Sequence, residues 1–173
     1  MTQSARPAFL VTLALSMLIA SQPVAASSPS VSGGGTVDGP LGTTSQLGFN
    51  ASASGGDFLC VMAGRSGGFP FGPWASVQQM HVNGPVAAGS LTISGGVASF
   101  SGKATIHVVG KTSSGDVMTA TVTDVPFTSR QTAGGAGVAT HRLEVILPGI
   151  GLVAFPAIPA MAPLRSGHIT IKQ

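Results

Sequence analysis

Carboxylates and histidines are the side chains of this sequence that could perform acid–base or metal chemistry, and they are few. The carboxylates are Asp38, Asp57, Asp116, Asp124 and Glu144, and the histidines are His81, His107, His141 and His168. Paired-carboxylate catalysis needs two such groups on facing positions, but every aspartate lies at an expected turn or strand end, where aspartate commonly serves turn geometry. Each histidine falls in a different expected strand, and no two have the close spacing of a local metal motif. We therefore expect no catalytic residue, metal ligand or cofactor, with a cross-strand metal site as the alternative.

Two glycine-containing segments resemble catalytic or cofactor motifs only in part. Segment 64–67 lacks the spacing and the following helix of a serine-hydrolase nucleophile elbow. Segment 149–154 lies between Pro148 and Pro156 and leads into no plausible helix, so a dinucleotide-binding turn has no support. Neither segment predicts an enzyme.

Aromatic side chains gather in two stretches that could make contact surfaces. Phe69, Phe71 and Trp74 belong to a glycine- and proline-rich loop, and Phe155 belongs to the apolar segment 148–165. Rigid aromatic rings offer a large contact area at small entropic cost. We expect these four residues to bind a surface polysaccharide or another exported protein; the alternative is a plug over one end of the fold. The prolines and glycines of segment 148–165 argue against a membrane-spanning helix and favour an extra hairpin or an apolar loop.

Charged residues are scarce and scattered. They make up 8% of the chain, with 8 Lys and Arg against 5 Asp and Glu. Because no basic run is present, a nucleic-acid partner is not expected. The single cysteine, Cys60, cannot form an internal disulfide. We expect it to be a small buried hydrophobe, with pairing between two chains as the alternative.

The first 26 residues have the pattern of a secretory signal peptide. Arg6 is followed by an apolar stretch over 8–20 and by small residues at Val24-Ala25-Ala26. An uncleaved membrane anchor is the alternative, although the apolar stretch is short for a span of roughly 20 residues. After cleavage we expect a flexible leader over 27–35, then one domain over 36–173. The protein is accordingly expected outside the cell, with the periplasm or the cell surface as alternatives.

The clearest structural signal is a β-hairpin centred on Gly95-Gly96. Glycine reaches positive φ without steric cost, so this pair suits a two-residue hairpin turn. Such a turn predicts a register in which Ser94 faces Val97, Ile93 faces Ala98, Thr92 faces Ser99 and Leu91 faces Phe100. The apolar members then share one face of the hairpin, as one buried face requires.

The remaining chain predicts an all-β protein. The 25 glycines and 12 prolines argue against long helices, and no segment after residue 26 keeps a helical period over three turns. We expect a turn at Asn83-Gly84-Pro85, a polar loop over 127–137 and a strand over 57–63 that is covered on both faces or lies beneath a loop. Eight or nine short strands are expected in an antiparallel meander, as a closed or nearly closed barrel or, alternatively, a β-sandwich. The expected strands include 45–52, 75–82, 117–124, 141–147 and 167–172, besides the central hairpin, whose second arm extends to 109.

An ordered series of short motifs resembles a known family. The motifs are Ser-Gly-Gly-Gly-Thr-Val at 32–37, Leu-Gly-Phe-Asn-Ala at 47–51, Leu-Thr-Ile-Ser-Gly at 91–95, Ala-Ser-Phe-Ser-Gly at 98–102, Thr-Val-Thr-Asp at 121–124 and Gly-His-Ile-Thr-Ile at 167–171. The series resembles the post-COAP domain, a secreted bacterial domain without assigned activity. Similar domains have acidic residues near the positions of Leu59 to Met62 and Val125 to Phe127, so any cation site built from them is not expected here.

These observations predict an exported bacterial β-domain that is a non-enzymatic binding or structural module. One alternative is a secreted hydrolase with a cross-strand Asp/His site, which would require Asp116 or Asp124 within hydrogen-bond reach of a histidine. The other is a carrier with a small apolar ligand in its interior, which would require an open lumen rather than one filled by Phe49, Phe100, Ile93 and Val122.

Overall fold

The computed structural model describes residues 28–63, 68–155 and 161–173, and their architecture is all-β. The expected signal peptide and segment 64–67 lie outside these residues. Among the described residues, no helix has the length and apolar character needed to cross a membrane. The elements are β1 (Ser30–Asp38), a 3-10 turn (Pro40–Gly42), β2 (Thr44–Ser52), β3 (Gly55–Ala63), β4 (Phe69–Phe71), β5 (Trp74–Val86), β6 (Thr92–Ser94), β7 (Val97–Lys111), β8 (Val117–Thr132), β9 (Gly134–Gly135), β10 (Thr140–Leu147), β11 (Gly151–Phe155) and β12 (Ala162–Lys172).

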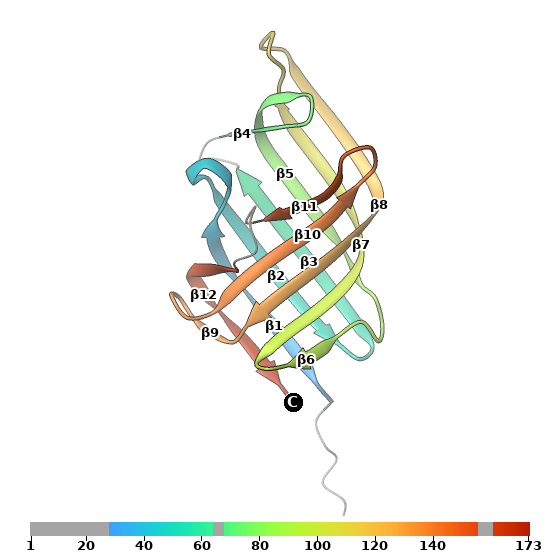
Figure 1. Ribbon diagram of the computed structural model, residues 1–173, viewed down its shortest axis with the longest axis vertical. Helices are drawn as coiled ribbons and strands as arrows, with labels where there is room; N and C mark the ends of the chain where they lie inside the picture. The colour runs from blue at the N-terminus through green and yellow to red at the C-terminus, as the bar shows by residue number, and fades with distance from the viewer. Residues whose placement is uncertain (1–27, 64–67, 156–160) are drawn as a thin grey trace, which may run out of the picture.

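The long strands form a closed ring of eight, in the order β10-β8-β7-β5-β3-β2-β1-β12 (Figure 1). All pairings are antiparallel, and β1 pairs with β12, so the first and last strands meet as expected. The ring closes through β10 and β12, which pair only at Thr140 with Pro163 and at His141 with Ala162. The short strands β4, β6, β9 and β11 flank the ring, which raises the total to twelve. Both expected descriptions, barrel and sandwich, fit this arrangement.

The central hairpin has the expected register. Thr92 faces Ser99, Ile93 faces Ala98 and Ser94 faces Val97. Gly95 and Gly96 have φ of 57° and 78°, the left-handed conformation that both central positions of a type I′ turn require. Turn chemistry and alternation were therefore sufficient to predict this pairing.

Two strands are longer than expected. β5 continues through Asn83-Gly84-Pro85, where a turn was predicted, and β8 continues to Thr132 through the predicted polar loop. Gly84 lies there because the neighbouring strand is close: a Cβ on it would lie 2.2 Å from the carbonyl oxygen of Lys103. In β8, Ser129 and Gln131 are polar yet completely buried, which hides the alternation expected of a strand.

The predicted leader over 27–35 is also wrong in most of its length, because β1 begins at Ser30. Gly33, Gly34 and Gly35 belong to β1, which lies between β2 and β12. A Cβ on Gly33 would lie 2.8 Å from the Cα of Ile169, and one on Gly34 would lie 2.8 Å from the carbonyl oxygen of Leu47. These glycines are therefore explained by close strand contact and not by chain flexibility.

Strand β3 alternates instead of being covered on both faces. Phe58, Cys60 and Met62 point into the ring and are buried, whereas Leu59 is 45% exposed. Burial raises the pKa of the Cys60 thiol to about 12. Cys60 is thus a buried apolar residue in this structure, and its thiol is not at the surface where a second chain could reach it.

The lower interior of the ring is filled by an aromatic core of four phenylalanines. Phe49 and Phe100 have ring centroids 5.5 Å apart, and Phe58 and Phe127 are stacked with centroids 5.0 Å apart. Each of the four is at most 7% exposed. Phe49 and Phe100 therefore fill this level of the interior, whereas Ile93 and Val122, the other two residues whose filling of the interior would exclude a carrier, are only partly buried.

Candidate functional site

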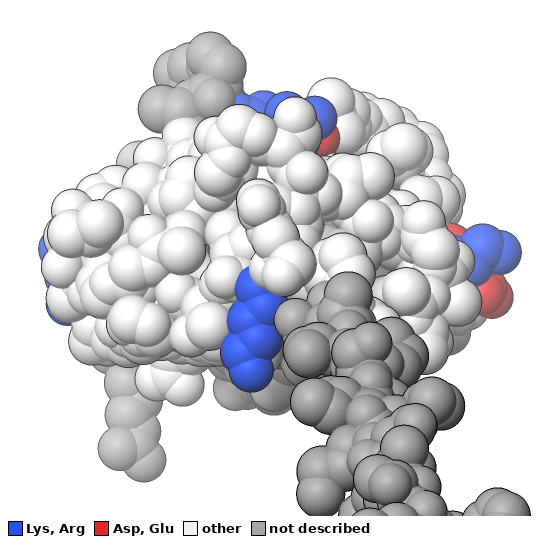
Figure 2. Space-filling view, turned by 90° about the horizontal axis from the view of Figure 1, so that it is seen from below, with Lys and Arg blue, Asp and Glu red and all other residues white. Residues whose placement is uncertain are grey.

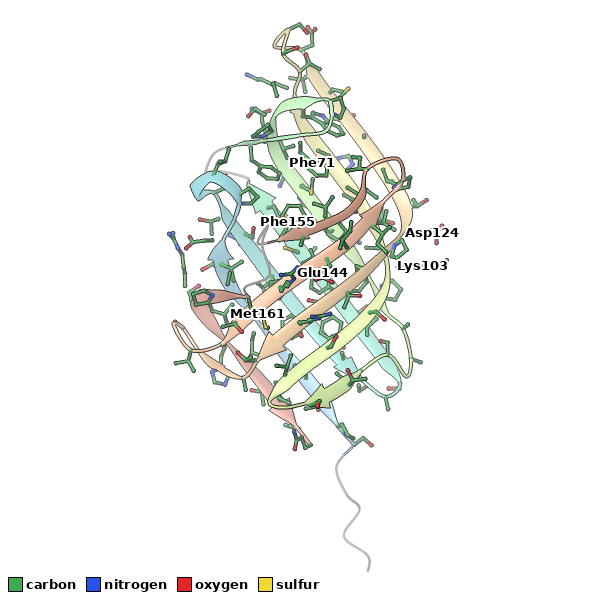
Figure 3. All side chains as sticks on the ribbon, in the orientation of Figure 1. Phe71, Lys103, Asp124, Glu144, Phe155 and Met161 are labelled. Carbon is green, nitrogen blue, oxygen red and sulfur yellow. The ribbon has the colours of Figure 1, made fainter. Side chains whose placement is uncertain are left out.

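The four predicted aromatic residues meet at the end of the ring opposite the chain termini, which we call the aromatic end. Phe69 packs edge-on against both Phe71 and Phe155, with ring centroids 6.5 Å apart in each pair. Trp74 pairs with Phe71 across the tight turn between β4 and β5. Figure 3 shows Phe71 and Phe155 between the β4–β5 turn and the β10–β11 hairpin. The structure therefore brings all four residues together from two distant stretches of chain.

Two of the four residues do not offer an exposed platform. Phe69 is 3% exposed and Trp74 is 7% exposed, while Phe71 and Phe155 are half-buried. The indole Nε1–H of Trp74 donates a hydrogen bond of 3.0 Å to the main-chain oxygen of Met118. Trp74 is consequently held in the wall of the ring, and its polar atom is not available to a sugar hydroxyl.

An apolar pocket of about 170 Å³ opens beside Phe71 and Trp74 at the aromatic end. Its wall combines side chains from β4, β5, β7 and β8 with the tight turn between β10 and β11. None of the described residues that line it has a charged or hydroxyl-bearing side chain. The lining residues are Phe71, Trp74, Ile106, Val108, Ala120, Val122, Leu147, Pro148 and Ile150.

The hairpin of β10 and β11 extends this apolar character to the outside. Ile146, Ile150 and Leu152 are 53%, 54% and 66% exposed, and Ile146 pairs with Leu152 across the hairpin. We call these three residues the hairpin lip. Ile150 also lines the apolar pocket, so one residue of the lip belongs to both features.

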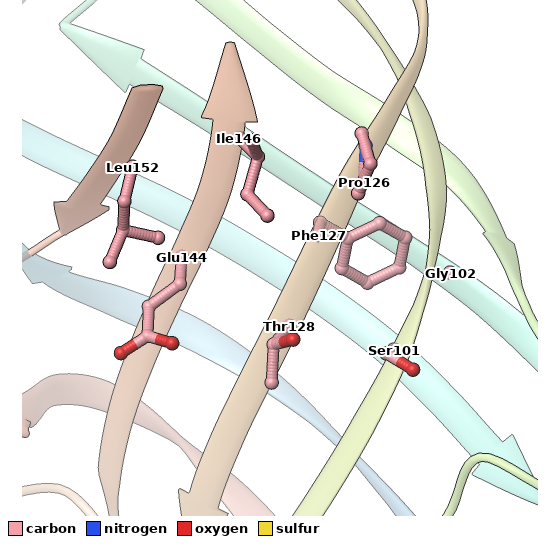
Figure 4. Close-up of a pocket in the computed structure, with 8 residues that line it drawn as sticks. All are labelled: Ser101, Gly102, Pro126, Phe127, Thr128, Glu144, Ile146 and Leu152. Carbon is pink, nitrogen blue, oxygen red and sulfur yellow. The ribbon is translucent and has the colours of Figure 1, made fainter.

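A second hollow of about 240 Å³ lies on the outer face of β7, β8, β10 and β11 (Figure 4). Ile146 and Leu152 of the hairpin lip line one side, and Ser101 and Thr128 line the other. Among the described residues that line it, Glu144 is the charged one, and its Oε1 lies 2.7 Å from Nε of Arg142. The hollow therefore presents an ion-paired carboxylate.

The Asp/His constellation of the hydrolase hypothesis is not assembled in the described part of the chain. Asp116 accepts a hydrogen bond of 2.6 Å from Ser114, and Asp38 pairs with Arg165. Asp124 occupies a bulge of β8 and has φ of 57°. None of Asp57, Asp124 and Glu144 makes a hydrogen bond to a histidine. No group of three or more potential metal ligands occurs among the described residues.

Three histidines are exposed or half-exposed on the ring, and the fourth is buried inside it. His141 is 2% exposed and is stacked near Phe49 and Phe58, with ring centroids 6.5 and 6.2 Å away. Neither of its ring nitrogens has a hydrogen-bond partner. Burial lowers the pKa of His141 to about 4, so it is neutral at neutral pH. His141 lies two residues before the buried Leu143 on β10, and both side chains point into the ring.

Sequence reasoning missed most of the apolar pocket. Ile106, Val108 and Val122 have the alternation of ordinary core residues, and their place beside a hollow depends on how far β10 and β11 reach along β8. Ile150 did carry a signal, because it belongs to the apolar segment 148–165 that was expected to form an extra hairpin or an apolar loop. The hairpin found here is one of the two forms expected for that stretch, although residues 156–160 lie outside the described chain.

Charged side chains are sparse on the one face of the molecule that Figure 2 shows. Figure 2 shows the end that carries the chain termini, where the blue and red side chains are scattered over a largely uncharged surface.

Comparison with protein-family models, with curated proteins and with solved structures finds no match for this chain. The proposal for its function therefore rests on the geometry described above.

Proposed function

We propose that the protein is an exported, non-enzymatic binding module that holds a small apolar group in the pocket at its aromatic end. The apolar pocket supports this proposal most directly. Its volume of about 170 Å³ is close to that of an engineered cavity of about 150 Å³ that binds benzene. A phenyl ring or a branched aliphatic group fits such a volume, whereas a long acyl chain does not.

The lining also favours an apolar partner over a polysaccharide. Sugar recognition combines aromatic stacking with hydrogen bonds to hydroxyl groups. The single polar side-chain atom in the pocket lining, Nε1 of Trp74, is already bonded to Met118. The exposed hairpin lip adds apolar contact area beside the pocket. Another exported protein that presents an apolar side chain is therefore the proposed partner. Export itself is inferred from the signal-peptide pattern over 1–26, and the post-COAP resemblance agrees with an exported module.

A carrier of a small apolar ligand is the second candidate, because the same pocket would hold it. A carrier would retain its ligand through purification, whereas a docking module would be purified with the pocket free. Organic extraction of the purified mature protein, followed by mass spectrometry, distinguishes the two. A single apolar compound recovered in equimolar amount would favour the carrier.

Binding of benzene as a probe tests the pocket directly. We expect ligand-induced NMR shifts at the lining residues with an affinity on the order of 1 mM, which corresponds to about 4 kcal/mol. Ala120→Leu should abolish these shifts because it fills the pocket. Thr119→Leu is the matched control, because Thr119 is exposed on the opposite face of β8. Shifts that persist in Ala120→Leu, or are absent in the wild type, would refute the proposal.

A further inference from the structure

Two histidines face each other on the outer surface of the ring. His81 on β5 and His107 on β7 are directly opposite in the antiparallel register. Residues directly opposite on neighbouring strands have Cβ atoms about 4.5–5.5 Å apart. Both side chains point away from the buried residues Val82 and Ile106, so they share the outer face. His107 is exposed and His81 is half-exposed.

One of these imidazoles is already oriented by a neighbour. Nδ1 of His107 lies 2.9 Å from Oγ1 of Thr121, the residue opposite it on β8. When Nδ1 carries the proton and donates it to Thr121, the lone pair of His107 is on Nε2. Orientation of a ligating histidine through its other ring nitrogen is a common feature of protein metal sites.

Beside His81 the outer surface is hollowed, which leaves room for further ligands. The hollow has a volume of about 560 Å³ and is open to solvent. Leu59, Asn83 and Pro85 line it together with His81. Asp57, the carboxylate of the hollow, lies on the neighbouring strand β3 at its far edge.

We propose that His81 and His107 form a two-imidazole site for a divalent transition-metal ion on the outer face of β5 and β7. Imidazole nitrogens bind such ions at about 2.0–2.1 Å, and the cross-strand spacing lets both rings turn toward one ion. Water molecules in the adjoining hollow complete the coordination. Zn²⁺, Ni²⁺ and Cu²⁺ suit imidazole ligands, and the general order of affinities ranks Cu²⁺ as the tightest. The site lies on the outer face of β5 and β7, whereas the apolar pocket is lined by inward-pointing residues of the same strands, and the site does not depend on the proposed function.

Calorimetric titration of the untagged mature protein with Ni²⁺ tests the site. One ion is expected per chain. His81→Gln and His107→Gln should each weaken binding by more than tenfold, and Thr121→Val should weaken it by about tenfold through the lost orientation of His107. These residues are on the surface, and a circular dichroism spectrum confirms that the variants remain folded.

His168→Gln is the matched control for these substitutions. His168 is an exposed histidine in a strand, but the residues opposite it are Gly34 and Gly135. Its substitution should leave Ni²⁺ binding unchanged. The proposal is overturned if the wild type does not bind Ni²⁺ at about 1 mM, if His81→Gln and His107→Gln bind as the wild type does, or if His168→Gln weakens binding as much as they do.

Discussion

Acidification should destabilise this protein through His141. The imidazole is 2% exposed, lies near Phe49 and Phe58, and has no hydrogen-bond partner for either nitrogen. The other described titratable side chain that points into the ring is Cys60, which carries no charge because its pKa is raised to about 12. Arg142 and Glu144 flank His141 along β10 but point outward, where they pair with each other. Among the described residues, no negative charge inside the ring therefore compensates an imidazolium.

The magnitude follows from the two pKa values of His141. Burial lowers the pKa from 6.5 to about 4 in the folded protein, so between these values the unfolded chain binds a proton that the folded chain does not. The contribution to stability is then fully present above pH 6.5 and falls as the pH drops toward 4. The shift corresponds to a loss of about 3 kcal/mol by pH 4, with about 2 kcal/mol already lost at pH 5.

Urea denaturation between pH 7.5 and pH 4 measures this loss. We expect the wild-type midpoint to drop by about 1–2 M more than that of His141→Gln, which cannot take up the proton. The comparison uses the pH dependence and not the absolute stability, so any packing cost of the substitution cancels. His168→Gln, which alters an exposed histidine, should keep the wild-type pH dependence. Equal pH dependence in the wild type and His141→Gln would refute the reasoning.

Two further predictions concern packing. Gly84→Ala should lower the free energy of unfolding by about 2 kcal/mol or more in urea titration, because its Cβ would lie 2.2 Å from the carbonyl oxygen of Lys103. Gly48→Ala is the control: its Cβ meets nothing within 4 Å, so it should raise the free energy of unfolding by about 0.5–1 kcal/mol. Similar effects of the two substitutions would contradict this explanation. The Cys60 thiol is buried, and its pKa is raised to about 12. It should therefore not react with a disulfide reagent at pH 8 until denaturant is added. Rapid labelling of the native protein would contradict this and would show that β3 opens.

The fold class and the central hairpin could be predicted because local signals agreed there. Alternation, turn glycines and strand length all indicated the same register around Gly95-Gly96. The prediction failed where a residue type that is common in turns or loops is instead needed for a contact between strands. Gly84 indicates a turn when read alone, yet it is needed for close approach of β7 to β5. Ser129 and Gln131 indicate a loop, yet they bond to each other inside the ring, with a 2.6 Å hydrogen bond from Nε2 of Gln131 to Oγ of Ser129.

The candidate sites were predictable only in part for the same reason. The aromatic residues Phe69, Phe71 and Trp74 are neighbours in sequence, so their proximity was expected. Their meeting with Phe155 depends on a hairpin that returns β11 along β10. The facing of His81 and His107 depends on the register between β5 and β7, which no tight turn sets, because β6 lies between them in the chain. Spacing along the sequence carries no information on such a pair.

The closure of the ring has a consequence for the order of folding. β1 pairs with β12 from Ser30 opposite Lys172, so this contact joins the two ends of the domain. Contacts between residues so distant in sequence form slowly, because the loop that they close carries a large entropic cost. A chain still in synthesis therefore lacks the strand that covers β1, and the hydrogen-bonding edge of β1 stays open to other chains until β12 has been made. The β10–β12 contact, which pairs Thr140 with Pro163, closes a much shorter loop, so the pairing of β1 with β12 is the slower of the two contacts that complete the ring.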